Sequence, residues 1–128
     1  MHLRLFRRDA FGPAHRSIAE CEHCGVAEKG GADPAAIRQA LKGGFADSII
    51  LQQHGERMTT GNFTPGGPSK FQLKDINNVQ EEAARCGLTL PLTTQMQERF
   101  KRFVEELDGA DKDHSGIWLE LLDSNGIN

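Results

Sequence analysis

The sequence predicts an all-α domain of five or six helices, and three observations lead to this fold class. Apolar side chains recur every three or four residues in several segments, which is the spacing of one face of an α-helix. Residues that start helices and glycines that end them separate these segments. Alternation of apolar and polar residues, which would indicate a strand, occurs only briefly near residues 3–7.

The N-terminal segment gives the weakest helical signal. Gly12-Pro13 breaks it, and we expect residues 1–26 to be divergent and only partly helical. A helix is predicted over residues 14–29. Its candidate inward positions are Ile18, Cys21 and Val26.

Capping residues define the next helix. Asp33 is a strong N-cap, and Pro34 suits the first helical position, where its missing N–H costs nothing. Residues 35–42 should therefore be helical, and Gly43-Gly44 supplies a left-handed terminator. The face expected to be buried consists of Ile37, Ala40 and Leu41.

The segment over residues 45–58 should contain a short helix with a bend. Ser48 can cap a helix that starts at Ile49, and Gly55 interrupts that helix. Residues 61–68 combine two prolines with three glycines, so they are predicted to form a loop.

Two longer helices follow this loop. The first starts at Ser69 and ends at Gly87, with a stripe of inward positions spaced three or four apart. Its members are Gln72, Ile76, Val79, Ala83 and Cys86. An extended connector over residues 88–91 leads to the second helix, which Asp108-Gly109 ends. Its stripe consists of Met96, Phe100, Phe103, Val104 and Leu107.

The last predicted helix follows an acidic turn over residues 111–114. Ser115 is the expected N-cap of this helix, and residues 125–128 are expected to form a frayed tail. Its packed side consists of Ile117, Trp118, Leu121 and Leu122.

Composition and charge exclude several classes of protein. A length of 128 residues with 38% hydrophobic and 26% charged residues fits one globular domain. The net charge of −3 gives no positive field, so we expect no nucleic-acid partner. The longest apolar run, residues 49–51, is far shorter than the ~20 residues that span a bilayer. We therefore expect no membrane association and a cytoplasmic location, with a transit peptide in the arginine-rich residues 1–16 as the alternative.

Cysteine and histidine positions predict neither a metal site nor a catalytic centre. Three cysteines cannot all pair, which favours a reducing compartment. Cys21 and Cys24 form the only C-x-x-C, and zinc would need a second pair of ligands at short spacing. Such a pair is absent because Cys86, His54 and His114 are scattered along the chain. No histidine has an acid and a nucleophile at readable spacing, so we expect no catalytic residue.

The order and spacing of several short fragments resemble the C-terminal half of β-hydroxyacid dehydrogenases. This family includes 3-hydroxyisobutyrate dehydrogenase, tartronate-semialdehyde reductase and, more distantly, 6-phosphogluconate dehydrogenase. The match covers about residues 27–122, and we assign residues 27–124 to the corresponding domain. Its main fragments are Ala27-Glu28-Lys29-Gly30-Gly31-Ala32-Asp33-Pro34, Leu41-Lys42-Gly43-Gly44, Asn62-Phe63-Thr64-Pro65-Gly66-Gly67, Leu73-Lys74-Asp75-Ile76, Gly87-Leu88-Thr89-Leu90-Pro91 and Asp113-His114-Ser115.

The resemblance implies a fold, a cofactor and a site. It implies the helical fold of the 6-phosphogluconate dehydrogenase C-terminal domain, which packs against a Rossmann domain across a cleft that holds NAD or NADP. Lys74 and Asp75 match the Lys-Asp pair of the helix that faces this cleft. The lysine is expected to reach the dinucleotide, and the aspartate to support the lining near the beginning of its helix. Gly67 stands where some relatives have an aromatic residue.

Two parts of the family pattern have no counterpart in these residues. The glycine-rich dinucleotide fingerprint is missing, and so is the catalytic lysine, because residues 1–26 contain no lysine. We therefore expect a stand-alone or truncated cofactor-cleft and dimerisation domain that is inactive alone and has no cofactor of its own. The alternatives are a helical subunit of a split dehydrogenase with a separate Rossmann chain, and a small-ligand binding module.

The resemblance also implies a homodimer, because in the family this half supplies much of the dimer interface. We predict a homodimer in which the apolar stripes of residues 76–83, 96–107 and 117–121 find partners. A variant of this dimer exchanges the N-terminal helix about the hinge Gly30-Gly31. The sequence names no substrate and does not choose between NAD and NADP.

Overall fold

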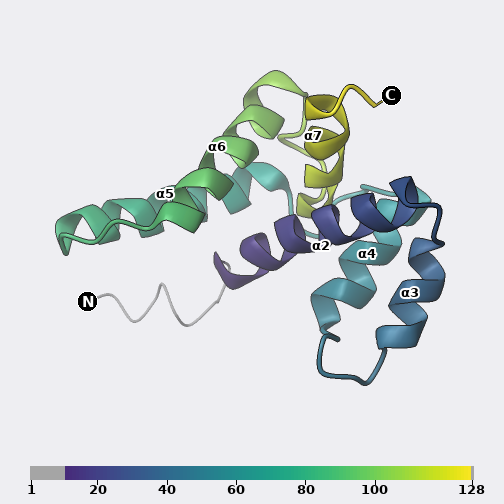
Figure 1. Cartoon of the computed structure of the whole chain (residues 1–128). Helices are drawn as coiled ribbons and strands as arrows, with labels where there is room; N and C mark the ends of the chain where they lie inside the picture. The colour runs from purple at the N-terminus through teal and green to yellow at the C-terminus, as the bar shows by residue number, and fades with distance from the viewer. Residues whose placement is uncertain (1–10, 128) are drawn as a thin grey trace.

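Helix α2 (Phe11–Lys29) crosses the middle of the molecule, and most of the other helices pack against it (Figure 1). The structure, a computed structural model, describes residues 11–127. The other helices in this range are α3 (Pro34–Leu41), α4 (Ile49–Thr60), α5 (Ser69–Arg85), α6 (Pro91–Glu106), the 3₁₀ turn η1 (His114–Gly116) and α7 (Ile117–Ser124). Apart from one isolated bridge, between Pro68 and Asp113, the described residues contain no β-structure. The predicted all-α fold is therefore confirmed.

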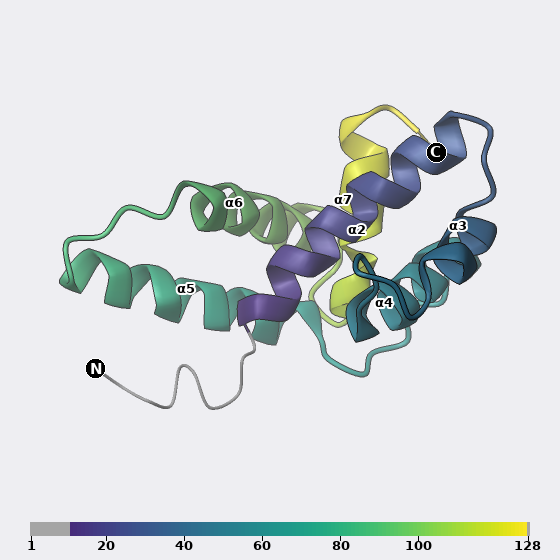
Figure 2. The same cartoon turned by 60° about the horizontal axis from the view of Figure 1, so that its bottom comes forward.

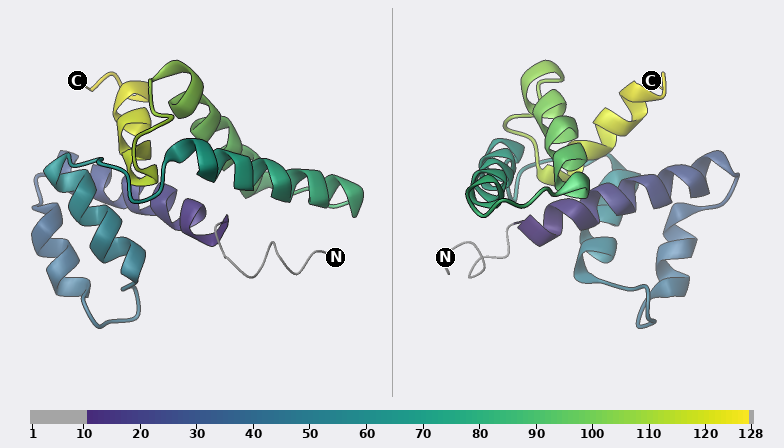
Figure 3. Two further views of the ribbon diagram at one scale, coloured as in Figure 1. Left: turned by 180° about the vertical axis from the view of Figure 1, so that it is seen from behind. Right: turned by 60° about the vertical axis from the view of Figure 1, so that its left-hand side comes forward.

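Two helical hairpins extend from α2 in different directions. Helices α5 and α6 lie side by side and form an arm at one end of the molecule (Figure 2). Helices α3 and α4 form the second hairpin at the other end (Figure 1). Helix α7 packs against both α2 and α6, as the two views of Figure 3 show. None of the described helices has the length and hydrophobicity needed to cross a membrane.

The capping residues set the helix starts as the sequence predicts. The Ala35 N–H donates to Oδ1 of Asp33 with an N···O distance of 3.0 Å, so α3 starts at Pro34. The Leu51 N–H donates to Oγ of Ser48 with an N···O distance of 2.9 Å, so α4 starts at Ile49.

Helix α4 is continuous through Gly55, and the predicted bend is wrong. The helix runs on to Thr60 and ends at Gly61, whose φ of 71° is left-handed. A Cβ at Gly55 would lie 2.9 Å from Cδ of Arg38, a residue of α3. Glycine is therefore explained here by the close approach of α3 to α4, and it does not break the helix.

Helix α3 buries none of its residues, which corrects the predicted inward face. Ile37 and Leu41 are half-buried, and Ala40 is exposed. The helix lies at the edge of the molecule, where α4 is its main partner. Helix α4 therefore covers only part of one face of α3.

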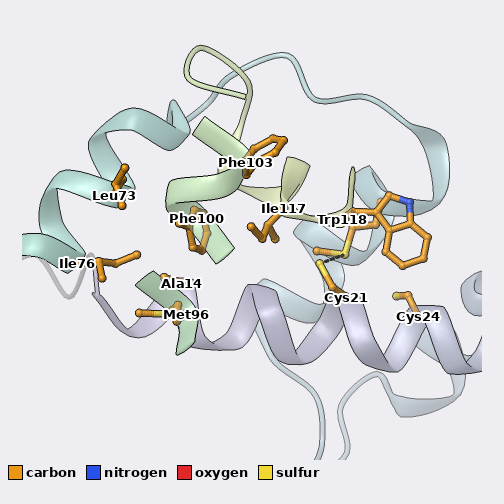
Figure 4. Packing of buried hydrophobic residues seen from close by; sticks show 11 residues of the cluster. Ala14, Cys21, Cys24, Leu73, Ile76, Met96, Phe100, Phe103, Ile117 and Trp118 are labelled. Atoms are coloured by element: carbon orange, nitrogen blue, oxygen red, sulfur yellow. Dashed lines mark hydrogen bonds between the residues drawn. The ribbon is translucent and has the colours of Figure 1, made fainter. Parts of the chain in front are cut away.

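The apolar core lies where α2, α5, α6 and α7 meet (Figure 4). Met96, Phe100 and Phe103 of α6 are buried as predicted, with Val104 and Leu107 packed around them. Ile117 and Ile76 are fully buried beside these rings. The stripes that were expected to need a second chain are thus largely covered within this one.

Three residues predicted to face inward are not buried. Val26 is 76% exposed because it faces away from the core at the far end of α2. On α5, Val79 is half-buried and Cys86 is exposed. The last turns of α5 extend beyond α2 along the arm, so only α6 covers them.

Ser115 does not cap the last helix: the N-cap of α7 is Gly116, which makes no side-chain cap hydrogen bond, and Asp113 caps the preceding turn η1. The Ser115 N–H donates to Oδ2 of Asp113 with an N···O distance of 3.0 Å, and Ser115 itself is fully buried within η1. At the end that we predicted to fray, the Ile127 N–H donates to the Leu122 carbonyl with an N···O distance of 2.9 Å. Asn128, the last residue of the predicted tail, and residues 1–10 of the predicted divergent segment lie outside the described residues.

Candidate functional site

The first turn of α5 is fixed to the segment that precedes α7. Ser69 is fully buried, and its N–H donates to the Lys112 carbonyl with an N···O distance of 2.9 Å. The Ser69 hydroxyl donates to the same carbonyl with an O···O distance of 3.0 Å. Gln72, also buried, lies with its Oε1 2.9 Å from Nδ1 of His114. The helix that carries the predicted cofactor residues is therefore held in position by buried polar contacts.

Lys74 and Asp75 lie side by side on this helix. Lys74 is exposed and Asp75 is half-buried, and neither forms an ion pair with another described residue. Lys74 lies between Phe71, which is 57% exposed, and the exposed Asn78 on the solvent face of α5. The structure thus presents a cation on an accessible face.

The position of Asp75 along α5 is beyond the reach of the helix dipole. Helix α5 begins at Ser69, so Asp75 lies in the second turn. The effect of the dipole falls off within the first turn. Asp75 therefore differs from Lys74 because it is half-buried at the edge of the packed face of α5.

Asp113 joins the loop over residues 61–68 to the turn η1. Its Oδ1 accepts from the N–H groups of Gly66 and Gly67, at N···O distances of 3.0 and 3.1 Å. Its Oδ2 accepts from the N–H and hydroxyl of Ser115. Burial alone raises the pKa of this carboxyl, but the hydrogen bonds outweigh that effect and lower the pKa to about 2. Arg57 adds a longer contact, with Nη1 3.7 Å from Oδ1.

Two histidines from distant parts of the sequence meet beside Asp113. The ring centroids of His54 and His114 lie 4.6 Å apart at an interplanar angle of 60°. Burial, reinforced by the positive field of His114, lowers the pKa of His54 to about 4. Burial also lowers the pKa of His114, against the opposing charge of Asp113. No local pattern in the sequence predicts this pair, because only the packing of α4 on η1 brings the two rings together.

The C-x-x-C cysteines lie in the core. The Cys21 thiol is fully buried and lies with Sγ 3.8 Å from Sδ of Met58, the contact dashed in Figure 4. Desolvation raises its pKa well above the usual range, and it also raises the pKa of Cys24. These thiols therefore pack as small apolar groups.

An open groove of about 780 Å³ lies between α2, α4 and α7. Its apolar floor includes Met58, Trp118 and Leu121, and its rim includes Glu22 and Lys29. No residue of α5 lines it, so Lys74 and Asp75 belong to a different surface.

Comparisons with known proteins agree on one family. Residues 13–121 match the family model described as NAD-binding of NADP-dependent 3-hydroxyisobutyrate dehydrogenase. This match begins upstream of residue 27, where the sequence resemblance started. The chain is 44% identical over 98 residues to 2-hydroxy-3-oxopropionate reductase of Escherichia coli (strain K12), covering 75% of this chain and 33% of that protein.

Solved structures show the same fold. A 3-hydroxyisobutyrate dehydrogenase from Salmonella typhimurium superposes with a TM-score of 0.81 at 15% identity, over 91% of this chain and 40% of its own. The enzyme of the same name from Mycobacterium tuberculosis superposes with a TM-score of 0.78 at 22% identity, over 88% of this chain and 40% of its own. The chain thus spans between a third and two fifths of the length of these proteins.

Proposed function

The chain belongs to the 3-hydroxyisobutyrate dehydrogenase family, and from this premise we propose that it is the helical cofactor-cleft and dimerisation domain of an NAD(P)-dependent oxidoreductase. The single observation that carries the proposal is the exposed Lys74 on a helix whose first turn is fixed by Ser69 and Gln72.

The residues on this face suit a dinucleotide. When bound, NAD(P) accepts or donates the hydride, and a partner domain would supply the other wall of its cleft. Lys74 would attract the pyrophosphate, because its ammonium is exposed and no described carboxylate neutralises it. Asp75, half-buried next to Lys74, would support the lining behind the cation.

The proposed substrate class is a small 3-hydroxy acid or the matching semialdehyde. The identity of 44% to the Escherichia coli reductase supports 2-hydroxy-3-oxopropionate, which is tartronate semialdehyde, over 3-hydroxyisobutyrate. Because these residues include neither the fingerprint nor the catalytic lysine, the 128 residues alone should give no turnover.

A reconstitution assay tests the proposed function. The protein is mixed with the separately produced N-terminal portion of the Escherichia coli reductase, extended to include the catalytic lysine that these residues lack, and NADH- and NADPH-dependent reduction of tartronate semialdehyde is followed. We expect turnover only in the mixture. Lys74→Ala should abolish most of it, whereas Lys101→Ala, which removes an exposed lysine of α6, should not. Turnover that is indifferent to Lys74, or no turnover from the mixture, would contradict the proposal.

A homodimer through the arm is the proposed assembly. Leu88 and Leu92 are 62% and 64% exposed where the chain passes from α5 into α6. Sedimentation equilibrium should show a dimer that Leu88→Asp with Leu92→Asp dissociates, while Phe45→Asp, at an exposed phenylalanine in the loop after α3, leaves it intact. A wild-type mass near that of one chain, 14.1 kDa, would show that the protein is a monomer.

A further inference from the structure

His54, His114 and Asp113 form a cluster that the proposed function does not use. One nitrogen of each ring and one carboxylate oxygen lie within 4.8 Å of one another. His54 comes from α4, whereas Asp113 and His114 come from the start of η1. His54 and Asp113 are 6% and 2% exposed, so the cluster is largely shielded from water.

Hydrogen bonds determine which nitrogen of each imidazole keeps its lone pair. Oε1 of Gln72 can only accept, so Nδ1 of His114 carries the proton and Nε2 keeps the lone pair. The Ser17 hydroxyl donates to the Pro13 carbonyl with an O···O distance of 2.9 Å. Its oxygen therefore accepts the Nδ1–H of His54, with an N···O distance of 2.6 Å. Both rings thus have a lone pair on Nε2, and no described residue forms a hydrogen bond to either Nε2.

Metal-binding histidines show the same arrangement, with Nδ1–H donated to an oxygen and the lone pair on Nε2 free for the metal. Such a histidine usually donates its second N–H to an oxygen, which fixes the tautomer and orients the ring. Gly67 leaves room beside the ring of His114, because a Cβ there would lie 3.5 Å from Nε2. A larger residue at this position would narrow the approach to that lone pair.

Asp113 supplies the negative charge, and Arg57 is its most replaceable partner. The contact of Arg57 to Oδ1, at 3.7 Å, is longer than those of the Gly66 and Gly67 N–H groups, at 3.0 and 3.1 Å. The Arg57 side chain is 32% exposed, and its Nη1 also donates to the Thr64 carbonyl with an N···O distance of 2.5 Å, so moving it into solvent breaks that hydrogen bond as well. A bound cation would then take the place of the guanidinium beside the carboxylate.

We propose that His54, His114 and Asp113 bind a divalent transition-metal ion that prefers imidazole, with Zn²⁺ as the first candidate. Bonds of about 2.0–2.1 Å place tetrahedral ligand atoms about 3.4 Å apart, so ligand atoms that lie up to 4.8 Å apart must close in by up to about 1.4 Å. Water completes the coordination. The donor set of two nitrogens and one oxygen excludes Mg²⁺ and Ca²⁺, which take oxygen ligands.

Metal titration of the wild-type protein is the first test. Isothermal titration with ZnCl₂ should give one ion per chain, and the Co²⁺ form should lack thiolate charge-transfer absorption. In nitrogen-detected NMR spectra the Nε2 resonances of two histidines should shift while their Nδ1–H signals persist. This measurement needs no variant, so it decides the matter even where a substitution unfolds the chain. No binding, or Co²⁺ bound through thiolate, would overturn the proposal.

Variants assign the ligands. His54→Gln and His114→Gln should each abolish binding, whereas His23→Gln, at an exposed position of α2, should not. Ser17→Ala should weaken binding roughly 10–100-fold, because it removes the oxygen that orients His54. Arg57→Met should strengthen binding several-fold by removing the competing cation. Binding that survives both histidine substitutions but not Cys21→Ser with Cys24→Ser would place the ion at the thiols and refute the proposed site.

Discussion

The junction at the start of α5 and the hairpin of α3 and α4 are built in opposite ways. At the junction, Ser69, Asp113 and Ser115 are at most 2% exposed, and their polar groups bond to one another and to nearby backbone. In the hairpin, α3 buries none of its residues and is tied to α4 by exposed or half-buried contacts such as Arg38 to Thr59. Buried polar contacts therefore hold the start of α5, the helix that carries Lys74, more firmly than the exposed contacts hold α3.

Truncating the core beside the junction should have the largest effect. Phe103→Ala removes a fully buried ring that also contacts Gly109 and Gly116, so we expect a loss of about 3–5 kcal/mol in the free energy of unfolding. Urea unfolding followed by circular dichroism measures it. Leu41→Ala in α3 is the matched control, and an equal loss there would show that the two regions are equally well packed.

Removing the Asp113 carboxylate should lower the free energy of unfolding by nearly as much. Asp113→Ala leaves the N–H groups of Gly66, Gly67 and Ser115 without their acceptor, which should cost about 3 kcal/mol. Asp111→Ala is the control, because that side chain is exposed. Thermal unfolding of both variants gives the comparison, and similar melting temperatures would argue against an anchoring role.

Acidification should weaken the junction before the hairpin. The pKa of His54 in the folded protein is about 4, below the unfolded value of 6.5. Its neutral form is therefore favoured by folding, so its contribution is complete above pH 6.5 and is lost as the pH falls toward 4. We expect a loss on the order of 2 kcal/mol in metal-free buffer across this window. His54→Gln should flatten the profile, and His23→Gln should not; a profile that His54→Gln leaves unchanged would assign the titration to other groups.

Removing the cap of α3 should have the smallest effect. Asp33→Ala deletes the acceptor for the Ala35 N–H and should cost about 1 kcal/mol. Amide hydrogen exchange should rise within α3 and stay unchanged at the start of α5. Faster exchange in both regions would mean that the hairpin and the junction unfold as one unit.

Local features of the sequence predicted most of the helices. The caps at Asp33 and Ser48 and the spacing of Met96, Phe100 and Phe103 depend on neighbours along the chain, so they could be recognised without the fold. The prediction failed where a distant partner decides the outcome. Gly55 accommodates Arg38 of another helix.

The candidate site was less accessible to prediction. Lys74 and Asp75 came from the resemblance and not from any local pattern, and their role in cofactor binding stays a prediction. The contact between His54 and His114 arises from tertiary packing alone. The apolar stripes expected to form a dimer interface are largely covered by the chain itself, because periodicity shows that a face is buried but not what buries it.

The packing of α2 against α7 also has a consequence for how the protein is made. Cys21 and Ala14 of α2 share the core with Ile117 and Trp118, so this core closes only when distant ends of the described chain meet. During synthesis α2 leaves the ribosome long before α7, and its inward face has no complete partner in that interval. The α3–α4 hairpin, whose contacts are local, can form early, whereas the core must assemble after translation has passed α7.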